Sequence, residues 1–181
     1  MTSTVRNRLA RRSITGARIA SACAATAAAL VLVGWATGNV GLTSVYLPGP
    51  TMKTNAALCA LCSALANLLF LSDGERRARR RIGLGLALAA ASIGALTLAQ
   101  HIANLDFGID QLLFSEPHGA FATASPNRMG PPASIAHILL CLSLVLSEVG
   151  QRRWRAQAQF AALLVCFITL LPLIGFAYGI D

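Results

Sequence analysis

Residues 76–103 read RRARRRIGLGLALAAASIGALTLAQHIA, an arginine run followed by a long stretch with no formally charged side chain. The apolar part is as long as the roughly 20 residues that an α-helix needs to cross a bilayer. Small residues recur in it four positions apart, as in Gly85/Ala89 and Ala90/Gly94, and this spacing lets helix backbones approach closely. An alanine-rich composition is the alternative explanation of these small residues. The stretch predicts a spanning helix that packs through small side chains.

The rest of the chain repeats this alternation of apolar stretches and basic turns. Of the 181 residues, 55% are hydrophobic and only 12% are charged, whereas about 25% are charged in an average soluble domain. The mean hydropathy of +0.62 agrees with a membrane protein. The predicted fold class is all-α, a polytopic membrane bundle of five transmembrane helices. The expected spans are about 17–37, 54–72, 82–103, 132–149 and 157–178.

The basic residues lie on one side of these predicted spans. The formal net charge is +8, and nearly all arginines precede the first span or lie in the second–third and fourth–fifth connections. Because basic loops stay on the cytoplasmic side, we expect the N-terminus and both arginine-rich turns there. This topogenic role explains the charge better than nucleic-acid binding does. Residues 1–16 are then a basic cytoplasmic segment, and residues 17–181 form the membrane domain.

The first span bears on signal-peptide cleavage, and the cysteines bear on disulfide formation. Arg11-Arg12 is similar to a twin-arginine signal, but the apolar core that follows is longer than the usual 7–15 residues of a signal peptide. We therefore expect an uncleaved span. All five cysteines fall inside predicted spans, which argues against a disulfide framework.

An internal repeat relates the second and third spans to the fourth and fifth. Met52 and Met129 each open a unit, and the stretches 107–110 (FGID) and 178–181 (YGID) each close one. Each unit would be an inward helix, an arginine turn, an outward helix and a Gly-Ile-Asp exit. We predict a duplicated helical hairpin, with chance identity of two short motifs as the alternative.

These motifs resemble those of a known family. Residues 108–114 read GIDQLLF, residues 127–131 read NRMGP and residues 52–59 read MKTNAALC. They resemble the N-terminal multi-span membrane sensor region of bacterial PAS-type sensor histidine kinases and diguanylate cyclases, over roughly residues 30–181. The resemblance implies an input module in the inner membrane of a bacterium, joined to a cytoplasmic signalling domain, with a response regulator as partner in a two-component system. The chain departs from the family pattern at Ala56 and Ala133 (for Thr), Ala60 and His137 (for Phe), and Ala64 and Cys141 (for Gly).

The loop expected between the third and fourth spans is the richest in polar side chains. Carboxylates and imidazoles there could bind a cation or respond to pH. The alternative is a solvated loop whose acidic residues pair with Lys53 and Arg128. We expect structural roles for Gly108, which tolerates helix-ending conformations, and for the Asp110 side chain, which can bond its own turn. The candidate sensing residues of the loop are Asp106, Asp110 and His118, beside Glu116 and His101.

Soft ligands lie inside the predicted spans. His137 and Cys141 are four residues apart and share a helix face, and an ionisable residue within a span is a candidate functional residue. Together with Met52 and Met129, they complete the candidate sensing set. Thiols and imidazoles suit copper(I), but a free cysteine also packs as a small apolar residue, and the imidazole could simply bond a backbone carbonyl or Asn67. The weak metal candidates are Cys59, Cys62, His137 and Cys141.

The sequence favours a non-catalytic membrane sensory module. It contains no catalytic motif and leaves the cofactors unknown, so a kinase or cyclase activity is implied only by the resemblance. The expected partners are the lipid bilayer, a second copy in a homodimer and a cytoplasmic signalling domain, and not nucleic acid. The alternative is a small transporter or channel subunit, because duplicated hairpins also occur in transporters. We expect the chain to be a truncated sensor that lacks a sixth helix and its output domain.

The charge distribution leads to a topological prediction. With a cytoplasmic N-terminus, five spans place Asp181 outside the cytoplasm. Alkaline phosphatase fused after Asp181 should therefore be active in the periplasm, and a green fluorescent protein that folds only in the cytoplasm should be dark at the same position. The reverse pattern would mean that one span is miscounted, and the first span would be the one to re-examine.

Overall fold

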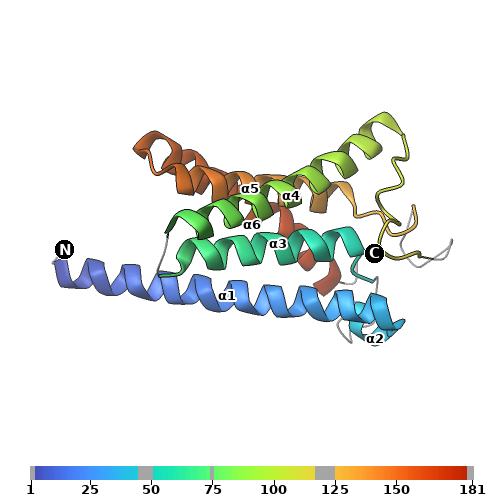
Figure 1. Cartoon of the computed structure of the whole chain (residues 1–181), viewed down its shortest axis with the longest axis horizontal. Helices are drawn as coiled ribbons and strands as arrows, with labels where there is room; N and C mark the ends of the chain where they lie inside the picture. The colour runs from blue at the N-terminus through green and yellow to red at the C-terminus, as the bar shows by residue number, and fades with distance from the viewer. Residues whose placement is uncertain (1–2, 45–50, 74–75, 117–124, 179–181) are drawn as a thin grey trace.

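A computed structural model describes residues 3–44, 51–73, 76–116 and 125–178, which contain helices and no strand (Figure 1). Five helices are long and apolar enough to cross a membrane. The predicted all-α bundle of five spanning helices is confirmed. The helices are α1 (Ser3–Thr37), α2 (Val40–Thr43), α3 (Thr54–Leu71), α4 (Arg76–Ala103), α5 (Pro131–Val149) and α6 (Arg152–Ala177).

The predicted spans match these helices apart from their basic ends. α1, α4 and α6 begin earlier than the apolar stretches, because each helix continues through the arginines that precede its span. Residues 3–16 of the basic N-terminal segment are thus the first turns of α1, and they extend past the neighbouring helices (Figure 1). The connection after α1 also contains α2, whose first turn is capped by the Asn39 side chain. Arginine has a high helix propensity, so a basic flank lengthens a helix at little cost.

The spanning helices pack in chain order. α3 contacts α1 on one side and α4 on the other, α5 lies between α4 and α6, and α3 also touches α5. We call the end of the bundle with residues 38–44, 51–53, 104–116 and 125–130 the loop end, and the opposite end the arginine end. The outer faces of α1 and α6 carry exposed leucines and phenylalanines, such as Leu163 and Phe167. Such faces match the acyl chains of a bilayer.

The core is built from small side chains. Its central cluster consists of Cys59, Ala66, Ala87, Ala90, Met129 and Cys141, on α3, α4, α5 and the segment that leads into α5. Gly94 faces α5 so closely that an added Cβ would lie 3.1 Å from the Ser134 carbonyl oxygen. The predicted small-residue contact therefore exists at Ala90 and Gly94. The pair Gly85/Ala89 is instead exposed, and a Cβ at Gly85 would meet nothing within 4 Å.

Ion pairs join neighbouring helices at the arginine end. Arg18 of α1 lies 3.2 Å from Asp73 and also donates to the Leu71 carbonyl oxygen, so α1 is tied to the end of α3. Glu148 of α5 lies 3.5 Å from Arg80 of α4.

The contact at Gly94 leads to a stability prediction. Gly94→Leu should destabilise the bundle by about 1–3 kcal/mol, because the new side chain overlaps the α5 backbone, which cannot move aside as a flexible side chain can. Gly85→Leu is the matched control, since it adds the same side chain to the same helix where there is open space. SDS-induced unfolding of the purified variants measures both. Equal effects of the two substitutions would contradict the close α4–α5 packing.

Candidate functional site

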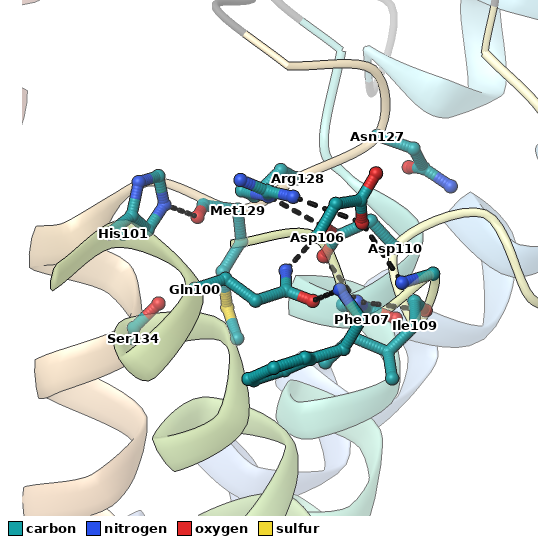
Figure 2. A network of polar contacts seen from close by, with 12 residues as sticks. Gln100, His101, Asp106, Phe107, Ile109, Asp110, Asn127, Arg128, Met129 and Ser134 are labelled. Carbon is teal, nitrogen blue, oxygen red and sulfur yellow. Dashed lines mark hydrogen bonds and ion pairs between the residues drawn. The ribbon is translucent and has the colours of Figure 1, made fainter. Parts of the chain in front are cut away.

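A network of hydrogen bonds and ion pairs holds the loop end together, and the Asp110 carboxylate is its centre. Gln100 Nε2 and Arg128 Nε both lie 2.6 Å from one carboxylate oxygen, and Asn55 Nδ2 lies 3.1 Å from the other. Figure 2 shows Gln100 and Arg128 pointing at Asp110. Asp110 is only 4% exposed, so its charge depends on these donors in place of water. The network joins α3, the end of α4 and the segment that leads into α5.

A second buried carboxylate, Glu116, joins the two connections at the loop end. Lys53 Nζ lies 2.6 Å and 2.9 Å from its two oxygens, and the Thr51 hydroxyl and the Asn127 backbone N–H also donate to it. The Glu116 side chain is 4% exposed and that of Lys53 is 11% exposed. The acidic residues therefore pair with Lys53 and Arg128, as the alternative interpretation of the loop expected. The carboxylates of Asp110 and Glu116 are, however, buried and not solvated.

Asn127 caps α3 from a distant part of the chain. Its amide oxygen accepts from the Thr54 backbone N–H at 2.9 Å, and its Nδ2 donates to the Thr54 hydroxyl at 2.7 Å and to the Phe114 carbonyl at 2.9 Å. The residue at the usual capping position, Lys53, offers no side-chain cap to the helix. Asn127 itself has a φ of 53°, a left-handed conformation that asparagine tolerates better than most residues. A fully buried asparagine thus satisfies a helix terminus that would otherwise lack an acceptor.

The two methionines that open the predicted repeats have equivalent backbone bonds. The Met52 carbonyl accepts from Trp35 Nε1 at 2.9 Å, and the Met129 carbonyl accepts from His101 Nε2 at 3.0 Å. Trp35 and His101 each lie in the last turn of a helix that runs to the loop end. This correspondence agrees with a duplicated unit, which stays a prediction. The Met129 side chain is 1% exposed within the central core, so it packs the bundle.

The turn after α4 assigns different roles to its two aspartates. The Asp106 side chain accepts from the Gly108 backbone N–H at 2.9 Å, and Gly108 has a φ of 69°. Asp106 is therefore the residue that bonds its own turn, a role expected for Asp110. Asp106 also reaches Arg128 at 3.2 Å, but its side chain is 74% exposed. Gly108 has the expected structural role, because its conformation favours a residue without a Cβ.

His137 lies apart from this network, within the spanning part of the bundle. It borders a cleft of about 250 Å³ between α1, α3 and α5, together with Ser21, Ser63 and Asn67. Asn67 donates to Ser21 at 2.9 Å and not to His137. Among the described residues, the buried Nδ1 of His137 has no hydrogen-bond partner. The expected hydrogen bond from His137 to Asn67 or to a backbone carbonyl is therefore not made by Nδ1, and for this atom the expectation is wrong.

The cysteines of the proposed soft site are packing residues in this structure. Cys59 and Cys141 are at most 1% exposed in the central cluster, and Cys62 packs against it. The Cys59 thiol donates to the Ala90 carbonyl at 3.5 Å. Within the described ranges, no three His, Cys, Asp or Glu side chains are grouped as metal ligands. The four weak metal candidates are thus divided between the core and the cleft.

No protein-family model, curated protein or solved structure matches the chain. The buried carboxylates at the loop end each accept several donors, which is the arrangement of a structural clamp. Such a clamp holds several chain segments in one arrangement.

The structure brings together some of the predicted residues and adds others. Asp106, Asp110 and Arg128 meet at one cluster, while His118 lies outside the described residues. Residue type alone gave no reason to select Asn55, Gln100 or Asn127, because uncharged amides are common at helix ends. The motif stretches did contain a signal, since Asn55 and Asn127 lie within residues 52–59 and 127–131.

The Asp110 cluster leads to a second stability prediction. Asp110→Asn should destabilise the protein by about 3 kcal/mol, because every partner of Asp110 is a donor and the new NH₂ group cannot accept from any of them. Asp106→Asn is the matched control: it keeps the acceptor for Gly108 and loses only an exposed ion pair worth about 0–1 kcal/mol. SDS-induced unfolding compares the two. A change for Asp110→Asn as small as that for Asp106→Asn would show that the buried carboxylate does not hold the loop end.

Proposed function

We propose that the chain is a non-catalytic membrane sensory module, the input part of a bacterial signalling protein related to sensor histidine kinases. One observation carries this proposal: the separate stretches on which the family resemblance rests converge in a single network. Asp110 comes from the stretch 108–114, Asn127 and Arg128 from 127–131, and Asn55 from 52–59, and all of them meet at the loop end. Motifs that are distant in sequence but form one cluster are expected to share one task.

The proposed input is a change in the pairing of buried charges at the loop end. Lys53–Glu116 and Arg128–Asp110 are buried ion pairs between segments that are distant in the chain. Losing one partner of such a pair leaves an uncompensated buried charge, which costs about 3–5 kcal/mol. A stimulus that binds or neutralises one of these groups would therefore favour a different packing of the attached helices. In the proposed orientation, the loop end faces the periplasm.

The proposed transmission follows the helices from the loop end to the arginine end. The network acts on the start of α3, the end of α4 and the residues before α5, and these three helices contact one another through the small-residue core. A close contact such as Gly94 with Ser134 resists gradual deformation, so a displacement at one end is passed along as a shift or rotation of whole helices. At the arginine end, such a shift would reach a cytoplasmic output domain.

The test measures whether the loop end controls the arginine end. After the exposed Cys23 and Cys166 are replaced by serine, nitroxide labels are attached through Ser13→Cys on α1 and Ile82→Cys on α4, and their separation is measured by pulsed electron paramagnetic resonance. Glu116→Gln, which breaks the buried pair with Lys53, should shift this separation by about 1–2 Å or broaden its distribution.

The matched control for this test is Asp106→Asn, which alters an exposed acidic residue of the same loop and should leave the label separation unchanged. Identical distributions for Glu116→Gln and the parent would contradict the proposed transmission. A steady potassium or proton conductance of the reconstituted chain in a planar bilayer would instead favour the channel or transporter alternative.

A further inference from the structure

A groove lies between α4 and α5 at the arginine end of the bundle. Its volume is about 640 Å³, and it is lined by Arg77, Arg80, Arg81, Leu84, Glu148 and Val149. α5 ends beside it, because Gly150 has a φ of 74° and terminates the helix in a left-handed conformation. The groove is thus a hollow formed by two packed helices at the point where a spanning segment begins.

Two positive charges in this groove have no acidic partner in the described part of the chain. Arg80 is held by Glu148, since Arg80 Nε lies 3.5 Å from the carboxylate and Nη2 donates to the Glu148 carbonyl oxygen at 3.2 Å. Arg77 and Arg81 are exposed, and neither has an ion pair or a hydrogen bond within the part of the chain that the structure describes. Three guanidinium groups therefore face one carboxylate, which leaves the groove with a surplus of two positive charges.

The charged and apolar parts of the groove are arranged along the helix axis. Arg77, Arg81 and Leu84 follow one another at spacings of four and three residues, so they lie on one face of α4. The arginines are at the start of the spanning segment, and Leu84 lies about two turns from Arg77 toward the middle of the bundle. Val149 provides a second apolar surface at the end of α5. The groove is therefore charged where a phospholipid would place its headgroup and apolar where the acyl chains would begin.

We propose that this groove is a binding site for the headgroup of an anionic phospholipid. The phosphate lies between the guanidinium groups of Arg77 and Arg81, and the first part of the acyl chains packs against Leu84 and Val149. Arginine suits this ligand because its planar fork of N–H donors matches phosphate oxygens. A free phosphate ion would use only the charged half of the groove, so the apolar half identifies the lipid as the occupant.

The site is distinct from the general attraction of basic residues to an anionic membrane. Arg11 and Arg12 are also exposed, but they lie in the first turns of α1, which extend past the other helices (Figure 1). These two arginines have no second helix beside them and no adjoining apolar groove among the described residues. They therefore serve as a matched pair of charges outside the groove.

The experiment measures lipid binding to the whole purified chain by native mass spectrometry. The chain is titrated with palmitoyl-oleoyl phosphatidylglycerol, which is anionic, and with the corresponding phosphatidylcholine, which is not. One phosphatidylglycerol should bind at least about tenfold more tightly than phosphatidylcholine, and Arg77→Gln/Arg81→Gln should abolish this preference, because each arginine near an anionic lipid contributes about 1 kcal/mol, or a factor of about five. Arg11→Gln/Arg12→Gln should keep the preference. Millimolar inorganic phosphate should not displace the lipid.

Three results would overturn the proposal. An equal loss of preference in the two double variants would show diffuse attraction, and the absence of a preference in the parent chain would show no site. Displacement by inorganic phosphate would show that the groove binds the free ion. Arg77→Lys/Arg81→Lys, which keeps both charges but removes the planar forks of N–H donors, should retain only part of the preference.

Discussion

A carboxylate at the loop end, buried and surrounded by donors, is the constraint on which the arrangement of the helices depends. Asp110 is held by Arg128, Gln100 and Asn55, which belong to three different parts of the chain. Moving an isolated carboxylate out of water is very costly, so the fold requires all three donors to be in place together. This requirement fixes where the segment after α4 lies relative to the start of α3, and it brings Asn127 next to the amide of Thr54, which Asn127 then caps.

The two ends of the bundle use charge in different ways. At the loop end, ion pairs such as Lys53–Glu116 are buried and connect distant segments, so they determine the tertiary arrangement. At the arginine end, the side chains of Arg18 and Arg80 are 41% and 45% exposed, and each makes a longer contact with one acidic partner. Exposed pairs contribute little to stability. The surplus of positive charge at the arginine end is more relevant to orientation in the membrane and to contacts with lipid headgroups.

The spanning core between these ends relies on close packing more than on polar contacts. Cysteines and alanines fill it, and Gly94 allows α4 to approach the backbone of α5. In a bilayer, helices gain little from excluding lipid, so close van der Waals contact has to hold them together. His137 is the exception, because its imidazole borders a cleft and its Nδ1 has no partner among the described residues. A rigid core with a clamp at one end suits a device that passes a change from one side of a membrane to the other.

The sequence alone was sufficient for the number of spanning helices and for their limits to within a few residues, apart from the arginine-rich extensions. An apolar stretch of about 20 residues has few alternatives to a membrane helix, because every backbone group must be hydrogen-bonded within it. The pairing of acidic loop residues with Lys53 and Arg128 was also among the expectations. Tertiary structure alone decided that Asp110 and Glu116 are buried, that Asp106 and not Asp110 bonds its own turn, and that Glu148 pairs with Arg80. Periodicity and charge describe single helices, whereas the contacts of the buried groups at the loop end join segments as many as 73 residues apart, as in Asn127 and Thr54. Their geometry exists only once the helices have packed.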